Sequence, residues 1–128
     1  MNIFDENITA DQRKLLRTWK VHFRHIGSEI GYRGMDDHEE IIPLLHTLRQ
    51  PTFFTGDDDF YKLNLRHNSY CIVYLDVFPH ETAEYIRRFL RHTSFRTQAQ
   101  RMGKVVRVRH SGLTWWESGA QVEHAQSW

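Results

Sequence analysis

The apolar run at residues 71–77, CIVYLDV, constrains the fold of this chain more than any other segment. A strand with one face in water alternates apolar and polar side chains, whereas this run is apolar almost throughout. Such runs are typical of central strands in parallel sheets, which are covered on both faces. Residues 52–55, TFFT, have a similar character and also predict a buried strand. The chain therefore needs covering elements on both sides of its sheet.

Helical patterns occur between the expected strands. The first begins at residues 9–12, TADQ, which have the spacing of a capping box. The second begins at Asp36 or Asp37, and Pro43 should either kink it or delay its start. The third begins at Pro79 and has apolar residues on one face and arginines on the other. Each pattern predicts an amphipathic helix that can cover a sheet.

The order of these patterns defines the expected fold class. A short apolar segment precedes Asp5, residues 21–27 alternate as a strand does, and residues 104–116 predict one or two late strands around a Ser-Gly turn. Strands that alternate with helices form right-handed βαβ units. We therefore expect an α/β fold with three layers, α/β/α, around a central, mostly parallel sheet. Residues 1–117 should form a single domain, with a polar C-terminal tail at residues 118–128.

Composition excludes several classes of protein. The single cysteine, Cys71, lies inside an apolar run, so it cannot form an internal disulfide and is expected in the core. No stretch approaches the roughly 20 apolar residues that a membrane helix needs. The start of the chain, MNIFDEN, lacks the basic and apolar regions of a signal peptide. We expect a cytoplasmic protein with no membrane segment.

Charge is unevenly distributed along the sequence. Residues 1–59 contain 11 acidic side chains against 7 Lys or Arg, whereas no acid lies between Glu84 and Glu117. An acidic part beside a basic part suits a protein that binds a divalent metal ion next to a polyanion. A solvated helix face and an exposed strand explain the basic stretch equally well. The arginines that we expect to contact RNA are Arg87, Arg88, Arg91, Arg107 and Arg109.

Acidic residues recur where the expected strands end. Asp5 follows the first strand, Asp57 and Asp59 follow the TFFT strand, and Asp76 ends the CIVYLDV strand. In open α/β sheets, ligands bind outside the carboxyl ends of the strands. Carboxylates held together repel one another unless a cation lies between them, and Mg²⁺ or Mn²⁺ prefers such oxygen ligands. The pattern predicts a metal site that could activate water against a phosphodiester, although each acid alone could be a helix cap or a surface residue.

Three segments resemble the PIN-like toxin group related to VapC. Residues 5–7, Asp-Glu-Asn, resemble the Asp-x-Asn that ends the first strand of PIN domains. Residues 55–60, TGDDDF, resemble the Thr-x-Asp-x-Asp-Phe signature, with Gly56 where the group often has Arg. Residues 34–41 look like the acidic start of the family's second helix. The resemblance covers roughly residues 1–90, with the three segments in the family's order.

The resemblance implies roles for individual residues. It assigns metal binding and catalysis to Asp5, Asp37, Asp57 and Asp59. Asn7 would orient Asp5, and Thr55 would hold its loop by hydrogen bonding. In the second segment, the alternatives to Asp37 are Asp36, Glu39 and Glu40. Asp76 is a reserve candidate at the end of a strand. Glu6 and Asp58 are expected to point elsewhere.

The function that the resemblance implies is a Mg²⁺- or Mn²⁺-dependent endoribonuclease, the toxin of a toxin-antitoxin pair. RNA would be the substrate and an antitoxin protein the partner. Trp115 and Trp116 are adjacent, so one of them could face outward to stack on a base or to close a homodimer.

Other readings of the sequence remain open. A catalytically silent PIN-like module that only binds a partner is the main alternative. A phospho-accepting receiver domain would share the early acids and Asp57, but it needs a Lys-Pro pair where this chain has Lys104 and Val105. Residues His22 and His25 are expected at the surface rather than as metal ligands, because their odd spacing on a strand sends them to opposite faces.

Overall fold

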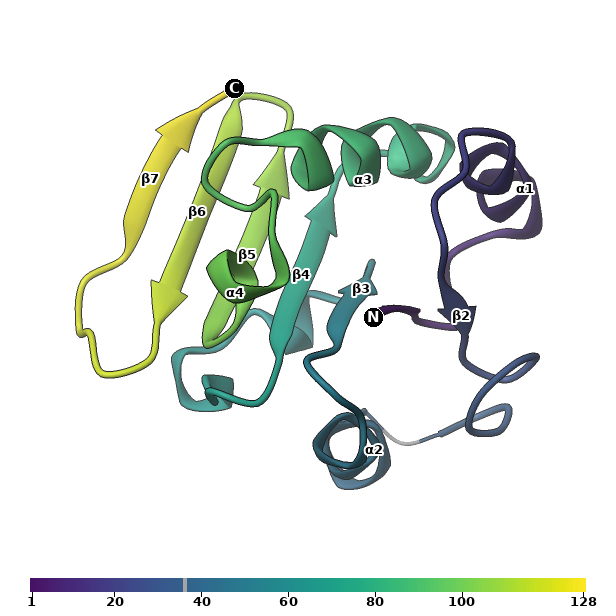
Figure 1. Ribbon diagram of the computed structural model, residues 1–128, viewed down its shortest axis with the longest axis horizontal. Coiled ribbons are helices and arrows are strands. Elements are labelled where there is room, and N and C mark those ends of the chain that lie inside the picture. Colours follow the sequence, from purple (N-terminus) through teal and green to yellow (C-terminus); the bar gives the residue numbers. More distant parts are fainter. Residues whose placement is uncertain (36) are drawn as a thin grey trace.

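A single seven-stranded sheet organises the chain (Figure 1), with the strand order β2-β1-β3-β4-β5-β6-β7. The computed structural model describes residues 1–35 and 37–128, and of Asp37 only the backbone. The pairings from β2 to β5 are parallel, and the last two are antiparallel. The expected α/β class with a mostly parallel sheet is confirmed. The strands are β1 Asn2–Phe4, β2 Arg24–His25, β3 Thr52–Thr55, β4 Cys71–Asp76, β5 Lys104–Arg109, β6 Gly112–Glu117 and β7 His124–Ser127.

Short helices connect the parallel strands. The α-helices are α1 Ala10–Thr18, α2 Ile42–Thr47, α3 Thr82–Arg91 and α4 Gln98–Arg101. A π-helical turn, η1 Asp37–Ile41, precedes α2, and three 3₁₀ turns are η2 Asp58–Phe60, η3 Leu63–Leu65 and η4 Pro79–Glu81. Pro43 falls in the first turn of α2, where its missing N–H costs no hydrogen bond. The helix at residues 9–12 forms without the expected cap, because the Thr9 hydroxyl donates to the Asp11 carboxylate instead.

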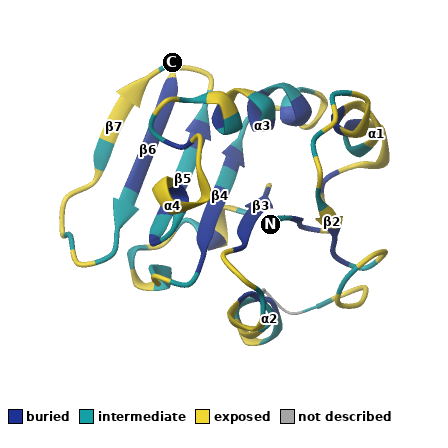
Figure 2. Cartoon of the chain, in the orientation of Figure 1, coloured by how far each residue is buried: buried dark blue, intermediate teal, exposed yellow. Residues whose placement is uncertain are grey.

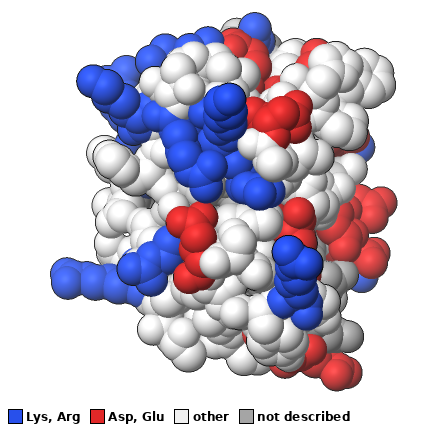
Figure 3. Space-filling view, turned by 90° about the vertical axis from the view of Figure 1, so that its right-hand side faces the viewer, with Lys and Arg blue, Asp and Glu red and all other residues white. Residues whose placement is uncertain are grey.

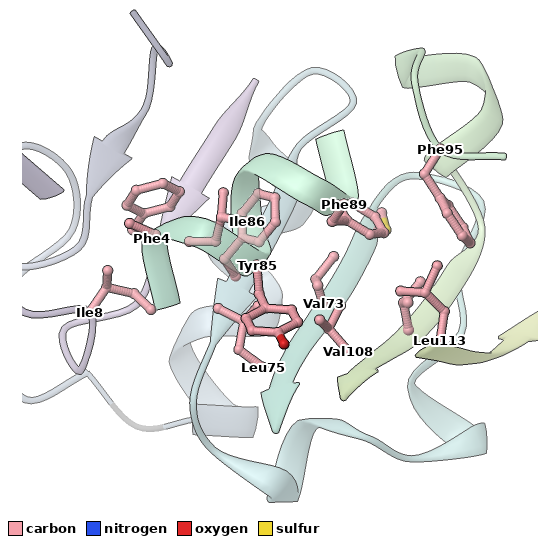
Figure 4. Close-up of a cluster of buried hydrophobic side chains, with 14 of the residues drawn as sticks. Phe4, Ile8, Val73, Leu75, Tyr85, Ile86, Phe89, Phe95, Val108 and Leu113 are labelled. Atoms are coloured by element: carbon pink, nitrogen blue, oxygen red, sulfur yellow. The ribbon is translucent and has the colours of Figure 1, made fainter. Parts of the chain in front are cut away.

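Both faces of the central strands are buried (Figure 2), as the continuous apolar runs predict. One face packs against α1 and α3, and Figure 4 shows the side chains between this face and α3. The other face packs against η1, α2 and η2. Neighbouring residues alternate between the two clusters, so Phe54 and Val73 face α3 while Phe53 and Ile72 face α2. Cys71 is fully buried as expected, and burial raises the pKa of its thiol to about 12.

Two ends of the expected pattern differ from the structure. Residues 118–128, expected as a polar tail, include β7, which pairs antiparallel with β6. The Trp128 indole also donates to the Arg109 carbonyl oxygen at 2.7 Å. Of residues 21–27, only Arg24 and His25 form a strand. Among the residues that the structure describes, no helix has the length and apolar character needed to cross a membrane.

Candidate functional site

The carboxyl ends of β1 and β3 bring Asp5 and Thr55 into contact. The strands are parallel with Phe4 opposite Phe54, and the Asp5 amide donates to the Phe54 carbonyl oxygen at 2.9 Å. The Thr55 hydroxyl donates to Asp5 Oδ2 at 2.7 Å. The same hydroxyl accepts a hydrogen bond from the Asp57 amide at 3.0 Å. One buried hydroxyl therefore links the carboxylate that ends β1 to the loop that follows β3.

Asn7 makes a second link between the same two segments. Its Nδ2 donates to Asp5 Oδ2 at 3.4 Å, and its Oδ1 accepts a hydrogen bond from the Gly56 amide at 3.2 Å. The Glu6 amide donates to Asp5 Oδ1 at 2.8 Å. These contacts fix the orientation of the Asp5 carboxylate. Among the described residues, Oδ1 accepts only the hydrogen bond from Glu6, so a lone pair on that atom stays available to a cation.

Three consecutive aspartates form an acidic turn, which we define as residues 57–59. One carboxylate oxygen from each of Asp57, Asp58 and Asp59 lies within 4.8 Å of the others. Asp57 Oδ1 accepts a hydrogen bond from the Asp59 amide at 2.9 Å, which caps η2. Asp58 was expected to point elsewhere, but η2 gathers all three side chains on one small turn. The acidic turn therefore offers one more oxygen ligand than the sequence predicted.

Burial dominates the electrostatics of Asp5. Its side chain is only 6% exposed, and this burial raises the pKa of the carboxyl above its ordinary value, with further increases from the charges of Asp57 and Glu6. The hydrogen bonds from Thr55 and from the Glu6 amide act in the opposite direction. A cation beside Asp5 would offset both unfavourable effects because it stabilises the charged form. The three-carboxylate group of the acidic turn does not include Asp5, which reaches that turn through Thr55.

The structure describes only part of the second acidic segment. Asp36 and the side chain of Asp37, the expected ligand of this segment, lie outside the described residues. Glu39 is exposed and Glu40 half-buried on η1. The His38 ring stacks on the ring of Phe60, with 5.4 Å between centroids and 5° between planes. Because Phe60 ends η2, this stacking places η1 against the acidic turn.

Asp76, the reserve candidate, is engaged in an ion pair. Its Oδ2 lies 2.6 Å from Nη2 and 3.1 Å from Nε of Arg107. Asp76 is also absent from the three-carboxylate group among the described residues. Its carboxylate neutralises the charge of Arg107. Asp76 is therefore the least suited of the strand-end acids to hold a metal ion.

The arginines of α3 lie on one side of the sheet and are held by local contacts. Arg87 and Arg88 both form ion pairs with Glu84, at 2.7 and 3.2 Å. The Arg87 guanidinium also lies 3.7 Å from the centroid of the Trp19 ring. Only Arg91 of this group is exposed without a contact of this kind among the described residues. Arg87 thus contributes to the packing of α3 on the end of α1, whereas Arg88 pairs within α3.

The arginines of β5 lie on the opposite side of the sheet. Val106 and Val108 belong to the cluster beneath α3, so Arg107 and Arg109, which alternate with them, face away from α3. The structure therefore does not bring the five expected arginines together on one rim. Tyr61, the residue after η2, donates to or accepts from the Thr114 hydroxyl at 2.9 Å, and Thr114 is opposite Arg107 in the sheet. The β5 arginines therefore share a face with the acidic turn.

Exposed Lys and Arg side chains also occur in the first half of the chain, on and after α1. Figure 3 shows Lys and Arg side chains gathered across the upper part of the face on which α1 lies. Lys14, Arg17 and Lys20, in and just after α1, are exposed. Counting charges over long segments hid them, because the acids of the same half outnumber them. The helical spacing of Lys14 and Arg17 was the signal that could have shown this surface.

Comparisons with protein-family models, with curated proteins and with solved structures found no match for this chain. The fold and the site together define an α/β protein with an acidic carboxyl edge.

Proposed function

We propose that this protein is a Mg²⁺- or Mn²⁺-dependent endoribonuclease with a three-layer, PIN-like α/β/α fold. The observation that carries the proposal is the pairing of buried Asp5 with the acidic turn through the Thr55 hydroxyl. That pairing lies at the carboxyl edge of a parallel sheet, the usual place for ligands in open α/β folds. The three acidic segments of the PIN-like resemblance supply the assignment of residues.

The donor set fits a hard divalent cation. Asp5, Asp57 and Asp59, with Asp37 from the second segment, would offer carboxylate oxygens only, which suits Mg²⁺ or Mn²⁺ better than zinc. When bound, such an ion lowers the pKa of water and stabilises charge that develops on a phosphate. Other residues of this chain orient the carboxylates that would bind the ion. Thr55 and Asn7 fix the Asp5 carboxylate, and the hydrogen bond that caps η2 fixes Asp57.

RNA is the proposed substrate, held by its phosphates beside the acids. Arg107 and Arg109 supply positive charge on the face that carries the acidic turn, and the α3 arginines supply a second basic surface on the other face. The partners proposed with this function are an antitoxin protein and a second copy of the chain. Trp115, 9% exposed, stacks on His124 of β7, so the half-buried Trp116 is the better placed of the two for an outward contact.

The test is cleavage of a labelled single-stranded RNA by the purified protein. We expect fragments with Mg²⁺ or Mn²⁺ and none with excess chelator, because the acids need the cation to approach a phosphate. Asp11→Asn, at an exposed acid on α1, is a matched control that should keep full activity. Undiminished cleavage in excess chelator would exclude this mechanism.

The alternatives predict different behaviour. A catalytically silent module would bind its partner and leave RNA intact with either ion. A receiver domain would need a lysine close to the accepting aspartate, but Lys104 begins β5 and lies at the amino edge of the sheet, opposite the edge where Asp57 follows β3. Lys104 lies 3.9 Å from Glu117 instead. This placement favours the nuclease over the receiver.

A further inference from the structure

A groove follows the carboxyl edge of the sheet beyond the candidate metal site. One hollow is lined by Asn7 and Gly56, which contact the site, and by Val77 after β4. A second hollow, with a volume of about 430 Å³, is lined by Val77, Phe78 and Arg109. Val77 lines both, so the two hollows are neighbours along this edge. The groove therefore leads from the Asp5 side of the edge to the end of β5.

An aromatic ring is held open to solvent at the far end of this groove. Phe78 is 60% exposed, unlike the buried phenylalanines of the core. Its amide donates to Glu81 Oε1 at 3.2 Å, and the same carboxylate oxygen lies 2.7 Å from His110 Nε2. The Phe78 ring lies parallel to the ring of His80 and 5.3 Å from that of His110. These contacts hold the ring in place rather than leave it on a loose loop.

Arg109 supplies an uncompensated positive charge beside that ring. Asp76 is its partner in the strand register, but the Asp76 carboxylate is paired with Arg107. Within residues 1–35 and 37–128, Arg109 forms no ion pair, and its Nε has no hydrogen-bond partner. Ser111 adds a hydroxyl to the same hollow. An exposed aromatic ring next to a positive charge is a combination with which proteins bind single-stranded nucleic acid.

We propose that this groove binds single-stranded RNA, with one unpaired base stacked on Phe78 and a neighbouring phosphate at Arg109. The strand then runs along the edge past Val77 towards Asn7 and Asp5. This inference rests on the proposed function for the choice of RNA, and it names the part of the substrate that the groove recognises. It predicts that the bound strand needs an unpaired base at the Phe78 end of the groove, because a paired base has no free face to offer.

The test is binding of a short, fluorescein-labelled oligoadenylate in EDTA, followed by fluorescence anisotropy. Phe78→Ala should weaken binding about five- to hundredfold, the usual effect of removing an aromatic stacking partner. Phe78→Trp should restore it, because indole also stacks. Val122→Ala, at an apolar residue that is 68% exposed and outside the groove, is the matched control and should bind as the wild type does. Duplex RNA of the same length should bind the wild type and Phe78→Ala equally.

Three results would overturn the inference. One is an unchanged affinity of Phe78→Ala for oligoadenylate, and another is an equal loss for duplex RNA. The third is a change of oligomeric state in Phe78→Ala, measured by sedimentation, with RNA affinity unaltered, since the ring would then cover a protein interface. Circular dichroism of Phe78→Ala and Phe78→Trp checks that both are folded, and the exposed position makes this the expected outcome.

The binding experiment contains no metal ion, so its outcome does not depend on whether the protein is a nuclease. Binding that depends on Phe78 without any cleavage in Mg²⁺ would leave the groove in place and remove the nuclease. Cleavage in Mg²⁺ by the wild type, together with unchanged RNA affinity in the Phe78 variants, would support the nuclease and exclude the stacking site.

Discussion

The two ends of β3 each bury a charged side chain against a threonine. At the carboxyl end, Thr55 donates to Asp5, and at the amino end Thr52 accepts from Arg101 Nε at 3.0 Å. Asp5 and Arg101 are equally buried, each 6% exposed. Burial shifts both groups towards their neutral forms, since it raises the pKa of Asp5 and lowers that of Arg101. The same strand therefore has a buried anion at one end and a buried cation at the other.

The surroundings of the two charges differ. The Arg101 guanidinium also donates to the carbonyl oxygen of the buried Phe95 at 2.8 Å, so it joins α4 to β3 within the packed interior. Asp5 lies beside other acids, and a hollow begins at Asn7 and Gly56 next to it. Arg101 has the surroundings of a structural clamp. Asp5 has those of a group that needs a cation from solution.

The largest expected effect is on catalysis. Asp5→Asn and Asp57→Asn should each reduce RNA cleavage about a hundredfold or more, because a metal ion typically contributes several kcal/mol to phosphate chemistry. Both variants should remain folded, since an Asn side-chain oxygen can still accept from the Glu6 or the Asp59 amide. Turnover at saturating Mg²⁺ measures the effect. Near-normal turnover in either variant would place that residue outside the metal site.

The next effect is on stability, at the other end of the strand. Arg101→Met should lower the free energy of unfolding by roughly 1–3 kcal/mol, because it leaves the buried Phe95 carbonyl oxygen without this donor. Cleavage per folded molecule should not change. Urea denaturation gives the stability and active-site turnover gives the rate. A loss of turnover in folded Arg101→Met would show that Arg101 affects catalysis and is more than a structural contact.

A smaller effect concerns pH. Because the folded-state pKa of Asp5 lies above its ordinary value of 3.8, its protonation contributes stability that is complete below pH 3.8 and is lost as pH rises through the folded-state pKa. In EDTA, the stability of the wild type relative to Asp5→Asn should therefore fall as pH rises through this window. Mg²⁺ should reverse the fall. A pH-independent difference in the free energy of unfolding between the two proteins would show that burial does not raise the pKa of Asp5.

The smallest effect compares the two groups of arginines. Arg109→Gln should reduce the salt dependence of RNA binding by about one phosphate contact. The double variant Arg88→Gln, Arg91→Gln should reduce it by less than that per residue, because α3 covers the other face of the sheet. Equal reductions per residue would mean that RNA contacts both faces.

The sequence identified the buried strands well because burial on both faces leaves a continuous apolar run. β4 matches residues 71–77 to within a residue, and Asp5 and Thr55 came together because parallel strands align their carboxyl ends. β7 was missed because an exposed edge strand needs no apolar side chains. His25 was expected at the surface but is 7% exposed, and its two ring nitrogens contact the Ser28 hydroxyl at 2.7 Å and Arg13 Nη1 at 3.2 Å.

The positions of charged side chains were harder to predict. Asp58 joined the acidic turn because η2 is helical, whereas an extended loop would have pointed it away. The arginines of α3 and β5 separated because the side of the sheet that a helix covers depends on how the chain crosses over. Neither property follows from residue spacing alone.

The buried thiol of Cys71 gives the chain an internal reporter of sheet opening. It is the only cysteine, it lies at the start of β4 with no exposed surface, and its raised pKa suppresses the reactive thiolate. A thiol reagent can therefore modify the protein only when the central strands separate, so the rate of labelling measures how often they do. Asp5→Asn and Arg101→Met can be compared in this way at the two ends of the neighbouring strand, with the native cysteine as the only reporter.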